Sequence, residues 1–111
     1  MEKRLLGSNG TKVSAMGIGA MSFSDFYGPT NDEKSYQILK TAMDLGIDHV
    51  DTANVYGMGM SEERIGKFLT TNGFSAKEHF KIATKGGISK DNSGKPFFDN
   101  SYNHLKKELD N

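Results

Sequence analysis

Short apolar runs of strand length alternate with amphipathic helical patterns three times along the 111 residues. The predicted strands are residues 14–21, 47–50 and 80–84, and the predicted helices are 30–46, 61–69 and a segment beginning near Ser101. A predicted hairpin over residues 4–13 precedes them, with Asn9-Gly10 favouring a tight turn. Strands that alternate with helices pair in parallel through right-handed crossovers, so the sequence predicts an α/β fold.

Four residues match helix-capping signals in the first two predicted helices. They are Thr30 with Glu33, a capping box; Gly46, a C-terminal glycine; and Ser61, an N-cap. Asn72-Gly73 is expected to stop the second helix, and residues 88–100 are expected to form a polar loop. The predicted inward faces consist of Ile38, Leu39, Ala42 and Met43 in the first helix, and of Ile65, Phe68 and Leu69 in the second.

The length of each strand-helix unit indicates a barrel. At roughly 30 residues a unit, eight units give a (β/α)8 TIM barrel of about 250 residues. We therefore expect residues 1–111 to supply the N-terminal hairpin and about the first three strand-helix units. On this interpretation they are the N-terminal part of a single barrel domain, truncated before the fourth strand.

Composition removes several classes of function. Lysine plus arginine and aspartate plus glutamate number 14 each, so no basic excess favours nucleic acid or an anionic membrane. The chain has no cysteine, which excludes disulfides and thiol nucleophiles. No apolar run is long enough to cross a bilayer and no signal peptide is visible, so we expect a cytoplasmic protein. The sequence says nothing of the oligomeric state.

Three side chains are expected to meet where strands end. Asp51 follows the second predicted strand, Lys85 follows the third, and Tyr56 lies on the loop between them. A tyrosine has a pKa of about 10, but a neighbouring ammonium favours its phenolate and makes it a better proton donor. Taken singly, the three residues are also typical of a turn aspartate, a packing tyrosine and a solvated lysine.

The stretches that carry these residues resemble the aldo-keto reductase family. "DTANVYG" with "ATKGG" about thirty residues later matches the family pattern, and "GIGAMSFSDFYGPT" and "YGMGMSEERIGKFL" are similar to its bacterial branch of aryl-alcohol and pyridoxal-type reductases. The resemblance implies reduction of a small aldehyde or ketone to an alcohol by hydride from a nicotinamide cofactor. By the family pattern Tyr56 protonates the product oxygen, Lys85 lowers the tyrosine pKa, and Asp51 pairs with the lysine.

The resemblance also implies a cofactor site. Gly19, Ala20 and Met21 match positions near the nicotinamide, and Asp51 faces its ribose. Ala20 stands where a threonine is common, so a hydroxyl contact is missing there. The cofactor is expected to be NADPH, with NADH left open, and no metal site is expected.

The family's fourth catalytic residue is a histidine that follows a fourth strand, which residues 1–111 do not include. None of the present histidines fits that role: His49 is expected to fill the barrel interior, while His79 and His104 are expected to be surface or packing residues. Residues 1–111 alone are therefore expected to be inactive. The expected substrate walls are Phe23, Phe26, Tyr27 and Met58.

Two alternatives stay open. One is a non-catalytic barrel that binds a nicotinamide cofactor and regulates a partner. The other is a partial barrel completed by association, although a parallel sheet with bare edges disfavours it.

Overall fold

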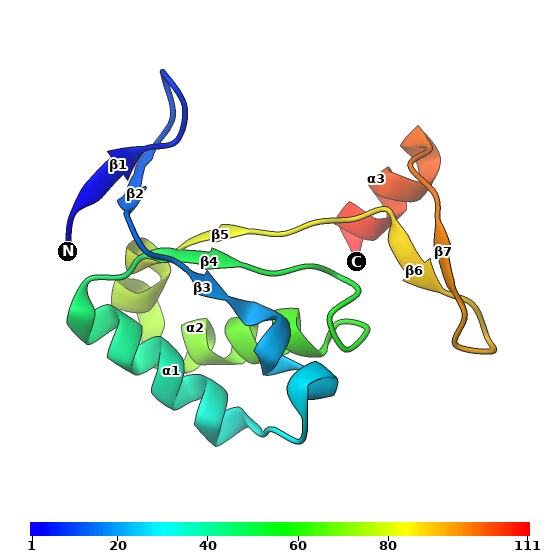
Figure 1. Cartoon of the computed structure of the whole chain (residues 1–111), viewed down its shortest axis with the longest axis horizontal. Helices are drawn as coiled ribbons and strands as arrows, with labels where there is room; N and C mark the ends of the chain where they lie inside the picture. The colour runs from blue at the N-terminus through cyan, green and yellow to red at the C-terminus, as the bar shows by residue number, and fades with distance from the viewer.

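The computed structural model describes all of residues 1–111 (Figure 1). Its strands are β1 (Lys3–Leu5), β2 (Lys12–Ser14), β3 (Ile18–Gly19), β4 (His49–Asp51), β5 (Lys81–Ala83), β6 (Ile88–Lys90) and β7 (Pro96–Phe98). Its α-helices are α1 (Asp32–Leu45), α2 (Met60–His79) and α3 (Tyr102–Asp110), and two short 3-10 helices are η1 (Ala20–Phe23) and η2 (Asp25–Tyr27). None of the helices combines the length and the apolar character that crossing a membrane requires.

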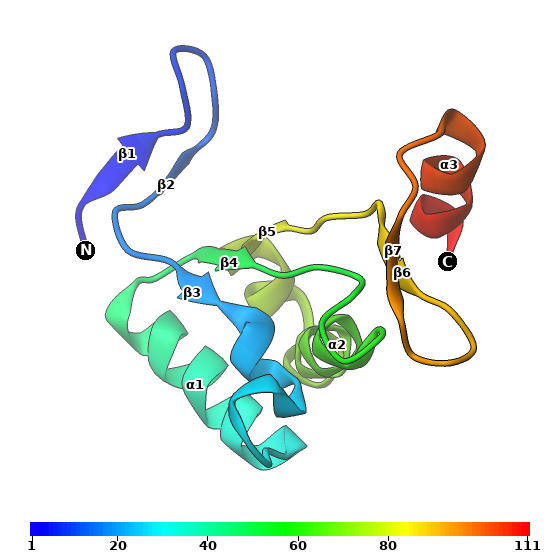
Figure 2. The same ribbon diagram turned by 45° about the vertical axis from the view of Figure 1, so that its right-hand side comes forward.

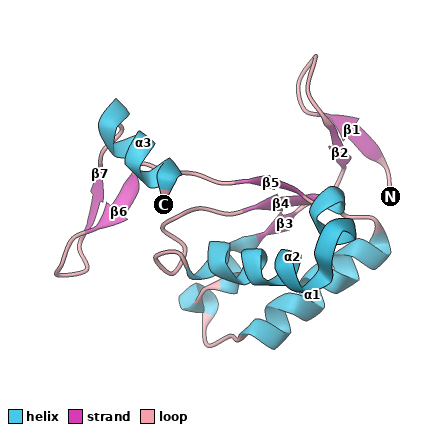
Figure 3. Ribbon diagram, turned by 180° about the vertical axis from the view of Figure 1, so that it is seen from behind, coloured by secondary structure: helices cyan, strands magenta, loops and turns pink.

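The central element is a three-stranded parallel sheet in the order β3-β4-β5. Its register aligns Gly19 with Asp51 and Asp51 with Ala83, so the carboxyl ends of all three strands form one edge. Helices α1 and α2 connect consecutive strands and cover the same face of the sheet (Figure 3). The predicted alternation of parallel strands and crossover helices is therefore confirmed.

The hydrophobic core lies between this sheet and its two helices. Phe23, Leu39, Val50, Ile65 and Phe68 are all buried there. The opposite face of the sheet carries no helix, as the views in Figure 2 and Figure 3 agree. The flanking residues of β4, on either side of the buried Val50, point to that uncovered face because side chains alternate along a strand.

The N-cap residues of the two long helices differ from those predicted. The N-cap of α1 is Asn31 rather than Thr30, because the Asn31 side chain accepts from the backbone N–H of Lys34 at 2.9 Å. Gly46 ends α1 at φ 74°, as predicted. In α1, Leu39 and Ala42 are buried as predicted, but Ile38 is 44% exposed.

Helix α2 begins at Gly59 as its N-cap, so the prediction of Ser61 as the cap is wrong. Gly73, at φ 72° and ψ −154°, breaks α2 into two helical segments joined at a kink, at the position where Asn72-Gly73 was expected to stop the helix. A second helical segment follows as far as His79 and buries Ala76 against the core. A glycine inside a helical pattern can break the hydrogen bonding locally while packing restores the helix beyond it.

The two hairpins correct two turn predictions. In the β1–β2 hairpin, Gly7 takes the positive φ of 70°, whereas neither Asn9 nor Gly10 has one. The predicted polar loop 88–100 contains the antiparallel pair β6–β7. Its turn is closed by the Asp91 carboxylate, which accepts from the backbone N–H groups of Ser93 and Lys95, and by Gly94 at φ 82°.

Helix α3 packs beside the β6–β7 hairpin, apart from α1 and α2 (Figure 2). The helix begins near Ser101, as predicted, and Ser101 is its N-cap, with its hydroxyl accepting from His104 N at 3.4 Å. Two of its apolar side chains, Tyr102 and Leu109, are 77% and 83% exposed. The apolar spacing of α3 therefore does not contribute to the core described above.

A buried carboxylate attaches the first hairpin to the sheet. Asp48, 2% exposed, accepts from the backbone N–H of Ser14 at 2.7 Å and pairs with the ammonium groups of Lys3 and Lys81. Burial opposes its charge, yet these partners hold the pKa of Asp48 well below its usual range. No sequence motif distinguishes this aspartate from an ordinary turn residue.

Candidate active site

The carboxyl edge of the parallel sheet brings the predicted site residues together. Beyond the strands, the backbone ladder continues, because Thr52 N donates to Ala83 O at 2.8 Å and Asn54 N donates to Lys85 O at 3.1 Å. The loops after β4 and β5 therefore run side by side as they leave the sheet (Figure 1). This pairing fixes the distance between the two loops that carry Tyr56 and Lys85.

Lys85 is the centre of the site. Its Nζ donates to Asp51 Oδ1 at 2.8 Å, to Asp51 Oδ2 at 2.9 Å and to the Thr52 carbonyl at 2.7 Å. The same Nζ lies 5.2 Å from the centroid of the Tyr56 ring. The structure thus gathers Asp51, Tyr56 and Lys85, with the lysine held by the aspartate and the tyrosine beside it.

The surroundings of Lys85 favour its ammonium form. Burial opposes the charge, but the hydrogen bond and charge of Asp51, followed by the Tyr56 hydroxyl, raise the pKa of Lys85 above its ordinary value. About half of each charged side chain is exposed, 48% for Lys85 and 51% for Asp51. Solvent therefore screens the ion pair, whose main consequence is orientation of the ammonium rather than stability.

A run of left-handed backbone positions places Tyr56. Gly57, Met58 and Gly59 have φ values of 65°, 51° and 96°, and Gly59 N donates to Asn54 O at 2.8 Å to close the loop. A Cβ on Gly57 would stand 2.7 Å from Met60 Cβ and 2.9 Å from Ser24 Cβ. Both the backbone angle and the space therefore require glycine next to Tyr56.

Ser61 connects three of the segments that form the site. Its Oγ donates to the Ala20 carbonyl at 2.8 Å and lies 2.8 Å from Thr52 Oγ1, which therefore donates to it. All three residues are buried. This network joins the ends of β3 and β4 to the first turn of α2. Sequence reasoning missed it because a serine at a helix N-terminus is usually a cap.

Arg64 makes a second connection that the sequence did not indicate. Its Nη1 donates to the Phe23 carbonyl at 2.5 Å, and its Nε donates to Asp32 Oδ1 at 2.9 Å. It therefore ties η1, which follows β3, to the start of α1. An arginine on a predicted helix carries no signal of such a partner.

The residues predicted to contact a cofactor differ from one another in their exposure. Gly19 is exposed beside Asp51, and no atom lies within 4 Å of the place a Cβ would take. Ala20 is fully buried and its carbonyl accepts from Ser61, so its side chain does not reach the surface. Met21 is partly exposed and lines a pocket beside Tyr56.

That pocket has a volume of about 400 Å³. Its lining is mostly apolar around the tyrosine and consists of Met21, Ser24, Asp25, Phe26, Val55, Tyr56, Gly57, Met60 and Lys90. Of the predicted substrate walls, Phe26 lines this pocket. Phe23 does not, because it is fully buried in the core, and the 73% exposed Tyr27 lies outside the lining.

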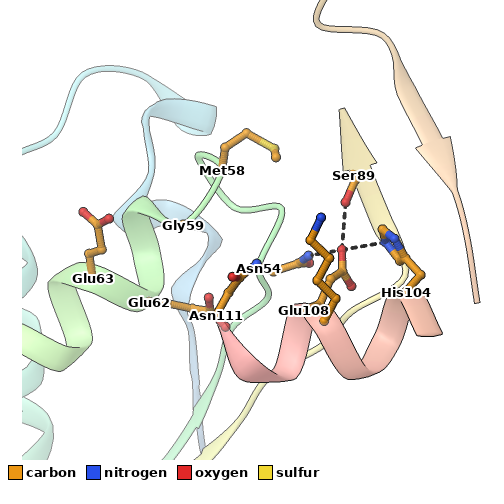
Figure 4. Close-up of a pocket in the computed structure, with 10 residues that line it drawn as sticks. Asn54, Met58, Gly59, Glu62, Glu63, Ser89, His104, Glu108 and Asn111 are labelled. Atoms are coloured by element: carbon orange, nitrogen blue, oxygen red, sulfur yellow. Dashed lines mark hydrogen bonds and ion pairs between the residues drawn. The ribbon is translucent and has the colours of Figure 1, made fainter. Parts of the chain in front are cut away.

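A second pocket, of about 570 Å³, lies between the Tyr56 loop, α2 and α3 (Figure 4). Met58, the remaining predicted wall residue, lines this pocket instead of the first. Ser89, His104 and Glu108 form hydrogen bonds on its far side. Sequence reasoning did not single out Glu108.

The three histidines lie in positions typical of structural residues, and His104 also pairs with Glu108. His49 lies on the uncovered face of the sheet, close to Gly17. His79 Nε2 lies 2.8 Å from the Ile47 carbonyl, and its ring meets Phe80 edge-on at 4.8 Å. His104 pairs with Glu108 at 2.9 Å.

Comparisons with known proteins agree with this fold. The Aldo/keto reductase family pattern matches residues 15–111. D-threo-aldose 1-dehydrogenase from a Pseudomonas species is 36% identical over 78 residues, covering 70% of this chain and 23% of that protein. The aldo-keto reductase yakc [NADP(+)] from Schizosaccharomyces pombe is 36% identical over 99 residues, covering 88% of this chain and 28% of that protein.

A solved structure gives the same result. The holo form of an aldo-keto reductase from Bacillus halodurans superposes with a TM-score of 0.81 at 31% identity, over 99% of this chain and 34% of that one. The chain belongs to the aldo/keto reductase family. It has the fold of the N-terminal part of the family's (β/α)8 barrel, as predicted, and spans 23% and 28% of the two curated relatives named above.

Proposed function

We propose that the protein containing these residues reduces an aldehyde or ketone to an alcohol with a nicotinamide cofactor, and that Tyr56 is the general acid. The observation that carries the proposal is the position of Lys85 Nζ, bonded to both oxygens of Asp51 and 5.2 Å from the centre of the Tyr56 ring. Family membership supports an oxidoreductase in general.

The three side chains have separate tasks in this mechanism. The Tyr56 hydroxyl donates its proton to the oxygen of the reduced carbonyl. Lys85 stabilises the resulting phenolate, because an ammonium beside the ring favours the charged form. Asp51 keeps the ammonium oriented by accepting two of its hydrogen bonds.

The residues at the edge of the sheet fit a nicotinamide cofactor. Exposed Gly19 leaves open surface beside the Asp51 carboxylate, which can accept hydrogen bonds from ribose hydroxyls as well as from Lys85. When bound, the cofactor supplies the hydride that the carbonyl carbon receives. The name of the Schizosaccharomyces pombe relative includes NADP(+), which favours NADPH over NADH.

The test uses the protein expressed from its complete reading frame, with NADPH and a reactive aldehyde. Tyr56→Phe removes only the transferable proton, so turnover should fall by about a hundredfold or more while cofactor binding stays nearly unchanged. Tyr102→Phe, at a 77% exposed position on α3, is the matched control and should keep normal turnover. Ordinary turnover by the Tyr56 variant would show that Tyr56 is not the general acid, whereas cofactor binding without turnover in the unaltered protein would favour a cofactor-binding regulatory barrel.

A further inference from the structure

One carboxylate on α3 collects hydrogen bonds from several segments around the site (Figure 4). Glu108 Oε1 accepts from Asn54 Nδ2 at 2.8 Å and from Ser89 Oγ at 2.7 Å, and Oε2 accepts from Gly87 N at 2.7 Å. His104 Nε2 lies 2.9 Å from Oε1. The Glu108 side chain is only 12% exposed, so these bonds are shielded from water.

Two of the donors belong to the loops that carry the proposed catalytic pair. Asn54 lies two positions before Tyr56, and Gly87 lies two positions after Lys85. Asn54 also donates its backbone N–H to the Lys85 carbonyl at 3.1 Å. The carboxylate of Glu108 therefore joins the same two loops at a second point, in addition to that backbone contact.

We propose that Glu108 is a positioning residue for Tyr56 and Lys85, holding the Asn54 and Gly87 segments at a fixed separation. This proposal rests on the proposed function, because it concerns the proton donor of that reaction. Glu108 acts through the backbone of the two loops and does not itself touch Tyr56 or Lys85.

The chemistry of the contacts requires a carboxylate. Asn54 Nδ2, Gly87 N and Ser89 Oγ all donate, and an ionised carboxylate only accepts. A glutamine would turn an NH2 group toward one of these donors, and an aspartate would be one methylene too short to reach all of them. Hydrogen bonds from Gly87 and Ser89, opposed by burial and assisted by His104, lower the pKa of Glu108 below its ordinary value.

The space around the Glu108 carboxylate is also restricted. A Cβ added to Gly86 would stand 2.7 Å from Glu108 Oε2. The chain after Lys85 thus approaches the carboxylate closely at Gly86 and Gly87, which have no side chain to prevent it. A small displacement of Glu108 would move the segment that follows Lys85, and a misplacement of about 1 Å in a catalytic group can cost about a hundredfold in rate.

The experiment separates kcat from KM, because a displaced proton donor lowers kcat whereas a general loss of structure also weakens binding. The protein from the complete reading frame is assayed with NADPH and a reactive aldehyde, and amide exchange is followed at Gly87. Four variants are compared: Glu108→Gln, Asn54→Ala, Glu63→Gln and Lys85→Met. Glu63 lines the same pocket, but its side chain is exposed and hydrogen-bonds to neither loop, so Glu63→Gln is the matched charge control.

We expect Glu108→Gln to lower kcat by about tenfold to a hundredfold with KM nearly unchanged, and to speed amide exchange at Gly87. Glu63→Gln should change none of these. Asn54→Ala removes one donor without disturbing the carboxylate, and a smaller loss of kcat is expected from it if Glu108→Gln does not fold.

The outcomes separate this proposal from the one on which it rests. If Lys85→Met lowers kcat while Glu108→Gln and Asn54→Ala leave it unchanged in folded protein, the positioning role is wrong and the proposed function stands. If Lys85→Met also leaves kcat unchanged, the tyrosine-lysine mechanism itself is wrong.

Discussion

Lys85 and Asp51 lie at the ends of neighbouring parallel strands, and the lysine donates to both carboxylate oxygens, at 2.8 Å and 2.9 Å. Because the Asp51 side chain accepts twice from one ammonium, the lysine is restrained in direction as well as distance. A third bond to the Thr52 carbonyl uses the last ammonium hydrogen. The position of the positive charge beside Tyr56 is therefore determined by backbone pairing between β4 and β5.

Replacing the lysine tests that charge directly. On the proposed function, Lys85→Met in the protein from the complete reading frame should reduce NADPH-dependent aldehyde turnover by about a hundredfold, comparable to Tyr56→Phe, because the phenolate formed on proton transfer loses its neighbouring ammonium. Lys67→Met, which removes an exposed lysine on α2, is the control. Equal turnover in both variants would contradict the role of Lys85.

Turnover should be sensitive to replacement of Gly57 even by alanine. Gly57→Ala forces a Cβ to within 2.7 Å of Met60 Cβ at a positive φ, so the loop must shift and carry Tyr56 with it. We expect turnover to fall by about tenfold to a hundredfold. Gly94→Ala imposes a similar backbone strain at φ 82°, with no atom within 4 Å, and should leave turnover intact. A similar loss in both variants would attribute the effect to general destabilisation.

Ser61 should matter for stability. Ser61→Ala leaves the buried Ala20 carbonyl without its donor and the Thr52 hydroxyl without its acceptor, at a cost of about 1–3 kcal/mol. Thr70→Ala removes an exposed hydroxyl from the same helix and should cost much less. Urea denaturation followed by circular dichroism compares the two. A Ser61 variant as stable as the Thr70 variant would contradict the network's importance.

The Asp48 carboxylate predicts a dependence of stability on pH. Its pKa in the folded protein lies below the unfolded value, so its contribution is fully present above the unfolded pKa of about 4 and is lost as the pH falls toward the folded pKa. Asp48→Asn should cost about 1.5–3 kcal/mol at pH 7 and flatten the acid side of the stability profile. Melting temperatures from pH 7 to pH 2 give the comparison. Parallel curves for the two proteins would show that Asp48 does not titrate in this way.

Residues 1–111 expressed alone should not catalyse reduction. One face of the sheet lacks any cover, β3 and β5 each have a bare edge, and Ile38, Leu45 and Ile82 are 44%, 59% and 40% exposed. Such surfaces favour self-association over a stable monomer. Size-exclusion chromatography and NADPH consumption should be measured beside the protein from the complete reading frame. A monomeric product with comparable turnover would overturn the expectation.

The parts of this molecule that the sequence predicts are those determined by periodicity or by position at a strand end. The order of parallel strands and helices follows from the alternation of apolar patterns. Asp51, Tyr56 and Lys85 come together because register places the ends of β4 and β5 side by side. Gly46 was predicted as a helix end because a left-handed residue there is nearly always glycine.

Other features depend on partners distant in the sequence. Ser61 resembles a cap until Ala20, 41 residues away, accepts its hydrogen bond. Glu108 reaches an amide 54 residues earlier, and no local pattern signals that contact. The β6–β7 strands are three residues each, too short for alternation to distinguish them from a loop. For Ser61 and Glu108, tertiary contacts override a local preference.

The hydrogen bonds that hold Asp51, Lys85 and the loop of Tyr56 lie between Ala20 and Glu108. On the proposed function, substitutions in loops outside this segment would change which carbonyl compounds enter without altering these bonds. Substrate preference can then change during evolution independently of the proposed proton donor.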